Sequence, residues 1–282
     1  MMFHTFVISA YQESPYLESC IKSLKAQTVP SEIICTTSTP SPYLTKLMEK
    51  YQIPLYVREG RSDIQEDWNF AISKASGEFV TVAHQDDMYN RHYTEELMKQ
   101  FDKWPDMTVF MTDAVTVKNG RLYHWGSKET VKKLLRLPLK LHRYSDKESI
   151  KKGVLKLGNP VMCPSCAYRK NYLPDPIFHS ELHFALDWDC MIDLAKWPGR
   201  FICVEKPLLY YRVHEDATTG ACIRDHSREK EERMIYEKFW SKPVVDLLMH
   251  FYRKAYKDYE EPDLWKKNRS NGGCLSLTGK AK

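Results

Sequence analysis

The sequence predicts an α/β protein built on a mixed, mainly parallel central sheet flanked by helices. Over residues 3–115, short apolar strand signals alternate with amphipathic helix signals, and the connections between them are short. Ser-Pro pairs at 14–15 and 41–42 are typical helix starts. Further along, the Asn-Gly pair at 119–120 follows a long apolar run and favours a tight hairpin, so antiparallel pairing is expected there.

Each element of the first half has its own signal. Apolar residues at helical spacing predict three helices, which start near Ser14, Ser41 and Ile64. Pro54 follows the second helix and Gly77 follows the third, as expected of helix ends. Runs of β-branched and aromatic residues predict the strands between them. These strands cover residues 3–9, 32–36, 55–57 and 79–83.

The second half has weaker signals. A helix is expected at 93–103 and a strand at 108–117. Residues 127–158 interleave leucines with basic residues, and we assign them no structure. The remaining predicted elements are strands at 161–169, 201–204 and 208–213, a helix at 186–196, and helices over 227–259 divided near Pro243.

The composition is that of an ordinary globular protein. Hydrophobic residues make up 43% of the chain, and no apolar stretch approaches the roughly 20 residues that cross a bilayer. Most of the eight cysteines lie inside strand or helix patterns, which favours a reducing compartment. Basic residues gather at 127–156, where they form either a phosphate-attracting patch or a solvated face. Nucleic-acid-binding motifs are absent, so no nucleic acid partner is expected.

Two adjacent carboxylates, Asp86 and Asp87, directly follow the strand at 79–83. Ligands of open α/β sheets bind beyond the carboxyl ends of such strands. Two acids at that place are costly without a cation, and a divalent ion with oxygen ligands would offset the cost. The alternative is a polar turn that caps the next helix.

Three more places carry candidate chemistry. Tyr11, after the first strand, would place an aromatic ring at the edge of the sheet. Asp187 opens the helix at 186–196 and is either a base or an N-cap. Arg212 and His214 follow an apolar strand and together could hold a diphosphate or a metal.

The order and spacing of these four places resemble the inverting glycosyltransferases of family 2, which have the GT-A fold. Ser-Ala-Tyr-Gln at 9–12 matches the family's small residue, Tyr and Asn, and Asn69 matches an Asn in the helix before the acidic strand. His-Gln-Asp-Asp at 84–87 takes the place of the Asp-X-Asp-Asp metal motif. Leu-Asp at 186–187 resembles the catalytic Glu-Asp pair, and Arg-Val-His at 212–214 matches the closing Arg-X-His pattern.

The resemblance implies a role for each candidate. Asp187 would be the general base that takes the proton of the acceptor hydroxyl. Asp87 and His214 would ligate Mg²⁺ or Mn²⁺. The other candidates would bind the nucleotide-sugar donor: Ala10, Tyr11, Thr37, Asn69, Asp86 and Arg212.

The chain departs from the family at two places. His84 replaces the first Asp of the metal motif. The second strand is followed by hydroxyl residues at 36–39 instead of the family's base-reading Asp. A hydroxyl such as that of Thr37, or a backbone group, would then read the base, and a UDP-sugar or dTDP-sugar stays the leading donor.

These inferences give the hypothesis of a cytoplasmic, metal-dependent inverting glycosyltransferase. Residues 1–220 would form the GT-A domain, with a nucleotide-binding half at 1–117 and an acceptor-binding half at 118–220. A helical extension at 221–262 and a flexible tail at 263–282 would follow. Two alternatives stay open: an inactive nucleotide-sugar-binding scaffold, and a sugar-phosphate nucleotidyltransferase.

The acceptor would be a hydroxyl of a glycan or of a lipid-linked saccharide. Residues 239–257 have the pattern of an amphipathic helix with basic residues. Such a helix either rests on the inner face of the cell membrane or packs against its own domain or a partner subunit. Peripheral membrane contact and a homo-oligomer are therefore both open expectations.

Overall fold

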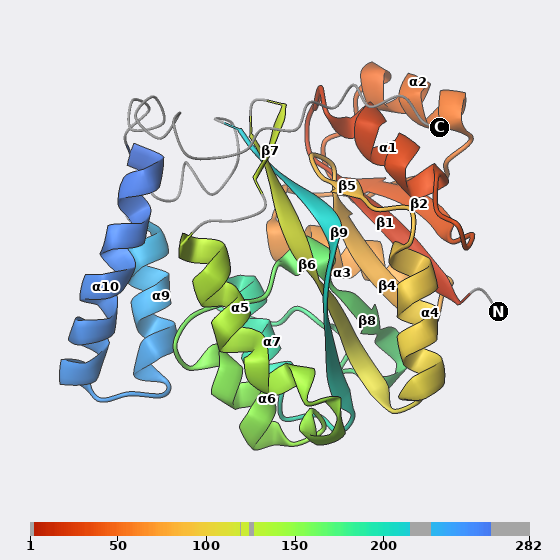
Figure 1. Cartoon of the computed structure of the whole chain (residues 1–282). Coiled ribbons are helices and arrows are strands. Elements are labelled where there is room, and N and C mark those ends of the chain that lie inside the picture. Colours follow the sequence, from red (N-terminus) through yellow and green to blue (C-terminus); the bar gives the residue numbers. More distant parts are fainter. Residues whose placement is uncertain (1–2, 119, 124–126, 215–226, 261–282) are drawn as a thin grey trace.

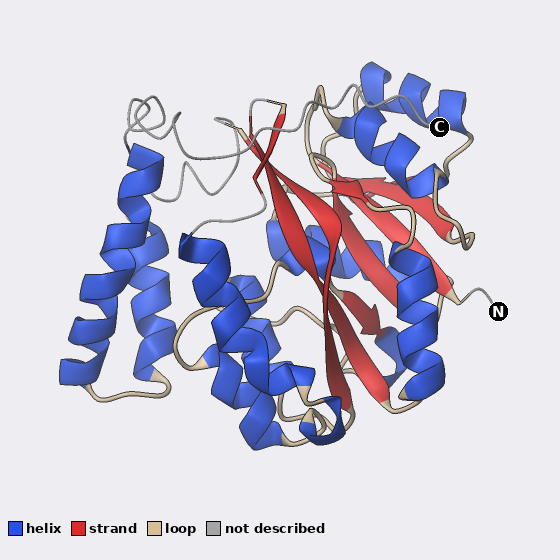
Figure 2. Ribbon diagram, viewed as in Figure 1, coloured by secondary structure: helices blue, strands red, loops and turns tan. Residues whose placement is uncertain are grey.

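The protein is built around one mixed sheet. The computed structural model describes residues 3–118, 120–123, 127–214 and 227–260. Within them, nine strands form a sheet in the order β3-β2-β1-β4-β8-β6-β9-β5, with β7 paired to β6. Figure 2 draws the strands in red. Pairing is parallel except at β5, β7 and β8, so the sheet is mixed and mainly parallel, as predicted. The strands are β1 His4–Ala10, β2 Glu32–Thr37, β3 Leu55–Val57, β4 Phe79–His84, β5 Met88–Tyr89, β6 Met107–Lys118, β7 Arg121–Tyr123, β8 Ala167–Arg169 and β9 Arg200–Val213.

Helices cover both faces of this sheet (Figure 1). Alternate residues of β1 divide the core, because Phe6 and Ile8 pack with α1, α2 and α4, whereas Val7 packs with the other helices. The result is the three-layer arrangement of an α/β protein. The helices are α1 Leu17–Lys25, α2 Pro42–Tyr51, α3 Ile64–Lys74, α4 Tyr93–Lys103, α5 Ser127–Lys140, α6 Glu148–Leu155, α7 Leu186–Leu194, α9 Ser227–Glu237 and α10 Lys242–Glu260.

The first half agrees closely with the sequence prediction. Ser41 caps α2 by accepting a 3.2 Å hydrogen bond from the Leu44 N–H, whereas α1 begins at Leu17, two residues later than its Ser-Pro signal indicates. The residue at position 77, shortly before β4, has to be small, and it is Gly77: a Cβ at this position would lie 2.7 Å from the Thr5 backbone nitrogen. The predicted hairpin joins β6 to β7 with Lys118 opposite Arg121; Asn119 of its turn lies outside the described residues.

The second half corrects two predicted strands. The separate strands expected at 201–204 and 208–213 are one strand, β9, whose pairing with β6 shifts register beside Pro207. A proline cannot donate to the ladder, so the irregularity lets the strand continue past it. The strand expected at 161–169 is shortened to β8, because a 3₁₀ turn at Cys163–Ser165 precedes it.

Helix α5 occupies part of the segment that we assigned no structure. Two of its cations face inward: Lys133 and Arg136 pair with Asp113 of β6 at 2.9 and 2.8 Å. Lys140 pairs with Glu205. These three basic residues are therefore used in ion pairs with β6 and β9. Three large apolar side chains of α5 are exposed. They are Val131, Leu134 and Leu137.

Helices α9 and α10 lie side by side at the left of Figure 1. They confirm the predicted division near Pro243. Val245 and Met249 of α10 are buried in the same core cluster as α7, whereas Leu247 and Phe251 are exposed. One face of this helix thus packs on its own chain, and the membrane contact predicted for 239–257 stays a prediction. In the part of the chain that the structure describes, no helix has the length and apolarity needed to cross a bilayer.

Some predictions fall on residues that the structure does not describe. The predicted domain boundaries after residues 220 and 262 lie there, as does the tail at 263–282.

Candidate active site

The parallel strands β1, β4 and β9 bring their carboxyl ends to one edge of the sheet. Beyond β4, residues 85–87 turn the chain back so that β5 pairs antiparallel with β9, with Met88 opposite Tyr210. The turn places the two acids beside the end of β9. Asp87 is followed by a strand, and the next helix has His92 at its N-cap, so the capping alternative for Asp87 is wrong.

Asp87 is almost completely buried, with 2% of its surface exposed. Its Oδ1 accepts a 2.8 Å hydrogen bond from the backbone N–H of Arg212, and its Oδ2 has no partner. Burial raises the pKa of this carboxyl well above its usual range, although the Arg212 N–H opposes the shift. A buried carboxylate oxygen without a donor is costly, and a bound cation would remove that cost.

Asp86, Arg212 and His214 are joined at the same place. His214 Nε2 lies 3.0 Å from Asp86 Oδ2, and Arg212 Nε donates to the Asp86 carbonyl at 2.9 Å. The Arg212 guanidinium also lies 4.4 Å from the ring centre of Tyr16, which holds its orientation. The structure therefore brings together four predicted residues that are far apart in sequence.

These residues fit a divalent metal that has few protein ligands and takes its other ligands from the phosphates of a bound substrate. No group of three or more Cys, His, Asp or Glu side chains forms a ready metal site within the described ranges. Two candidate ligand atoms, Asp87 Oδ2 and His214 Nδ1, are nevertheless buried and without a partner. Mg²⁺ is commonly bound by one or two protein ligands together with substrate phosphates. The pattern at this edge matches that mode.

The end of β1 lies beside the acidic turn. Tyr11 is 51% exposed, and its backbone N–H and carbonyl form hydrogen bonds of 3.2 and 2.8 Å with the Gln85 side chain. Gln12 has a φ of 53° and donates its N–H to Thr39 Oγ1 at 2.6 Å. The neighbouring Ala10 is buried. The exposed Tyr11 ring is thus held on a backbone tied to both β2 and β4 ends.

The end of β2 carries hydroxyls, as the sequence indicates. The Thr39 N–H donates to Thr37 Oγ1 at 3.0 Å. A carboxylate reaches the same place from α3, because Ser38 Oγ donates to Asp67 at 2.9 Å and Arg58 Nε donates to Asp67 at 2.6 Å. The sequence reasoning missed Asp67, since nothing in the spacing of α3 relates it to β2.

Asn69 is engaged away from the acidic turn. Its amide donates to the Phe178 carbonyl at 2.7 Å and accepts from the Phe178 N–H at 3.0 Å. It therefore ties α3 to the segment before α7. The neighbouring Trp68 stacks on His84 with ring centres 5.3 Å apart, and His84 Nε2 is buried without a partner.

Asp187 belongs to a second cluster, at the start of α7. Ala185 is the N-cap residue, so Asp187 is the second residue of the helix and the capping alternative is wrong here too. Its Oδ1 accepts from the Trp188 N–H at 2.7 Å, and its Oδ2 accepts from Asn159 Nδ2 at 3.2 Å. Burial raises the pKa of Asp187, while these bonds and the charge of Lys132 oppose the shift.

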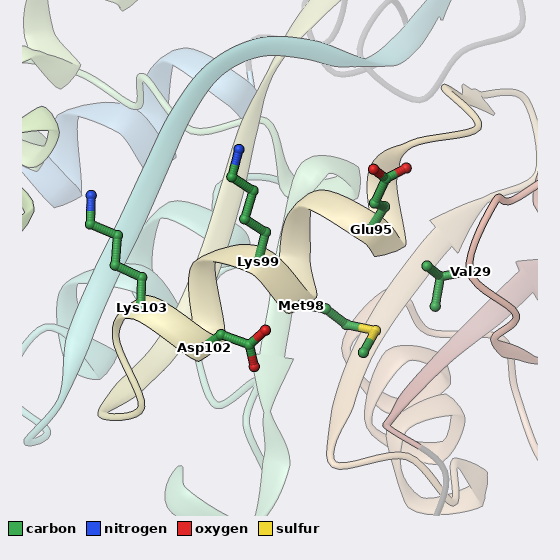
Figure 3. A pocket seen from close by; sticks show the side chains of 6 residues that line it. All are labelled: Val29, Glu95, Met98, Lys99, Asp102 and Lys103. Carbon is green, nitrogen blue, oxygen red and sulfur yellow. The ribbon is translucent and has the colours of Figure 1, made fainter.

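A hollow elsewhere on the surface lacks every predicted site residue (Figure 3). Its wall is the solvent-facing side of α4, and most of its side chains are charged and exposed. It offers no buried polar group to orient a ligand. Its lining residues are Val29, Glu95, Met98, Lys99, Asp102 and Lys103.

The solved structures similar to this chain share its fold. A TarS fragment of S. aureus, residues 1–349, solved with UDP-GlcNAc, has a TM-score of 0.60 and 17% identity, covering 96% of this chain and 76% of that one. The mannosyltransferase PcManGT of Pyrobaculum calidifontis, solved with GDP-Man and Mn²⁺, has a TM-score of 0.61 and 15% identity, covering 94% and 71%. The fold is thus of the GT-A class.

The family is shown by the sequence itself. The family model described as glycosyl transferase family 2 matches residues 5–174, and the chain belongs to that family. It is a glycosyltransferase. No curated protein matches the chain.

Proposed function

We propose that this chain is a metal-dependent inverting glycosyltransferase, which moves a sugar from a nucleotide-diphosphate sugar to a hydroxyl of a glycan or lipid-linked acceptor. The observation that carries the proposal is the buried Asp87 Oδ2, which has no partner and lies beside Arg212 and His214 at the ends of three strands. A cation with a diphosphate would satisfy this oxygen.

The donor end of the reaction needs positive charge. A divalent ion held by Asp87 and His214 would neutralise the diphosphate as it leaves. Arg212 adds a fixed guanidinium at the same edge, oriented by Asp86 and Tyr16. Asp86 would contact the ribose or the metal, and the exposed Tyr11 ring is suited to stacking on the base.

The acceptor end needs a base. Asp187 would take the proton of the acceptor hydroxyl while that hydroxyl attacks the sugar from the face opposite the diphosphate, which inverts the anomeric carbon. Burial raises the pKa of Asp187. The shift brings it nearer to neutral pH, where a general base is more effective.

Thr37 and its neighbouring hydroxyls would read the nucleotide base, and a uracil or thymine nucleotide is the proposed donor. Complexes of similar proteins support a nucleotide-sugar donor with metal. They include glucosyl-3-phosphoglycerate synthase of Mycobacterium tuberculosis, solved with Mn²⁺ and UDP-glucose at a TM-score of 0.53 and 16% identity, covering 81% of this chain and 76% of that one. A cytoplasmic location belongs to the same proposal, supported by the six cysteines of the described residues, which are buried free thiols.

The test is a panel of nucleotide sugars with and without Mn²⁺. A correct donor should raise the melting temperature of the protein only when metal is present, because binding to the folded state stabilises it. The same donor should also release nucleoside diphosphate slowly, with water as acceptor. Stabilisation without release would indicate a binding protein, and release of pyrophosphate from a sugar phosphate and a nucleoside triphosphate would indicate the nucleotidyltransferase.

A further inference from the structure

The start of α7, which carries Asp187, is held by a carboxylate from another helix. Glu231 of α9 is 9% exposed and accepts three backbone hydrogen bonds. The N–H groups of Phe184 and Ala185 donate to its Oε2 at 2.7 and 2.8 Å, and that of His183 donates to its Oε1 at 3.1 Å. Glu231 lies outside the segment that the family model matches.

This contact fixes the turn that leads into α7. A helix leaves its first N–H groups without internal partners, and the N–H of the N-cap residue is one of them. Ala185 is the N-cap of α7, and its N–H donates to Glu231 together with those of the two residues before it. Glu231 therefore holds the backbone only two residues before Asp187, and its negative carboxylate also suits the positive end of the helix.

Further contacts between α9 and α7 keep this arrangement rigid. The rings of Tyr236 and Trp188 meet edge to face at 5.2 Å, and Lys238, which directly follows α9, pairs with Asp189. The Arg228 guanidinium lies 5.0 Å from the ring centre of Phe184. α9 thus contacts α7 and the turn before it along most of its length. Glu231 is the residue of α9 that accepts hydrogen bonds from the backbone of that turn.

We propose that Glu231 is a positioning residue for the reaction, which holds the Asp187 carboxylate against the acceptor hydroxyl by fixing the turn at 183–185. The inference rests on the proposed function. It adds that α9 contributes to catalysis through the backbone, because Glu231 contacts the N–H groups of the turn before the base. Misplacing a catalytic group by about 1 Å can cost 100-fold in rate.

The test compares Glu231→Gln with Glu229→Gln, a matched change two residues away that meets Arg253 of α10 instead of α7. The assay is Mn²⁺-dependent release of nucleoside diphosphate, expressed per donor-binding site. Glu231→Gln should lower kcat roughly 10-fold to 100-fold and leave the KM for the donor unchanged. Glu229→Gln should match the wild type. A merely structural role would reduce the number of binding sites and leave kcat per site unchanged.

A double-mutant cycle with Asp187→Asn makes the test specific. If Glu231 acts through Asp187, Glu231→Gln should change the residual rate less than twofold once Asp187 has been replaced. An equal loss in both backgrounds would overturn the proposal. Glu231→Asp keeps the charge and covers the case in which Glu231→Gln does not fold. The kcat of Glu231→Asp should lie between those of the wild type and Glu231→Gln.

The two proposals fail in different ways. If the wild type gives no metal-dependent release of nucleoside diphosphate from the donor, the proposed function fails. If the wild type is active and Glu231→Gln equals Glu229→Gln in kcat per site, only the role of Glu231 fails.

Discussion

The two clusters of candidate residues, at the acidic turn and at the start of α7, differ in how their polar side-chain atoms are satisfied. At the acidic turn, His84 Nε2, Asp87 Oδ2 and His214 Nδ1 are buried without partners, and they are three of the seven such side-chain atoms among the described residues. At the start of α7, both oxygens of Asp187 accept hydrogen bonds. Buried polar atoms without a hydrogen-bond partner indicate a place for a ligand, whereas buried polar atoms that are fully hydrogen-bonded indicate a fixed side-chain geometry.

The comparison separates binding from catalysis. The donor end consists of Asp86, Asp87, Arg212 and His214. Its buried polar atoms without partners would be satisfied by a metal and a diphosphate, so its side chains should matter most for affinity. The base end is Asp187 with its hydrogen-bond partners, whose bonds are already made, so its side chains should matter most for rate. Three substitutions test this division.

Asp187→Asn should have the largest effect. The amide has nearly the shape of the carboxylate but cannot take a proton, so the rate should fall about 10²-fold to 10⁴-fold. The measurement is Mn²⁺-dependent release of nucleoside diphosphate at saturating donor. Metal-dependent thermal stabilisation by the donor should stay at its wild-type value, and its loss would show that Asp187 belongs to the donor end instead.

The donor end was largely predictable from the sequence. Asp86 and Asp87 follow a strand with a clear apolar signal, and parallel strands necessarily bring their carboxyl ends to one edge. Arg212 lies at the end of β9 and His214 directly follows it, so their meeting with the acids depends on topology. Local signals sufficed because the chemistry lies at strand ends.

The residues that hydrogen-bond Asp187 and the turn before it were not predictable in the same way. Glu231 and Asn159 act on α7 from 46 and 28 residues away, and no spacing rule links them to it. Helix α5 misleads for a related reason: Arg136 faces inward to a buried Asp113, whereas sequence patterns assume that charges face water. Such pairs are decided by tertiary packing.

Asp87→Asn should have the next largest effect, on binding. Donor at 100 times its dissociation constant should stabilise the wild type by about 2.7 kcal/mol when Mn²⁺ is present, and the variant should lose this stabilisation. Without ligand the variant should be more stable at neutral pH. Burial raises the folded-state pKa of Asp87, so its contribution to stability is full at low pH and is lost as the pH rises through that value.

Thermal unfolding with and without Mn²⁺ and donor checks both parts of this prediction. Asp102→Asn, an exposed change on α4, serves as the control and should behave as the wild type. A variant at Asp87 that keeps its metal-dependent stabilisation would contradict the assignment of the donor end.

Asn159→Ala should have the smallest effect, on pH dependence. Asn159 donates to Asp187 Oδ2, and this bond favours the charged form of the base. Without it the pKa of Asp187 should rise further. Because the base acts when deprotonated, activity falls as the pH drops through that pKa, and the acidic limb of kcat should move to higher pH by up to about one unit. Asn171→Ala, an exposed change, should leave the limb in place. A limb that stays fixed or moves to lower pH in Asn159→Ala would mean that the hydrogen bond does not stabilise the charged base, and that the base end is less complete than its contacts indicate.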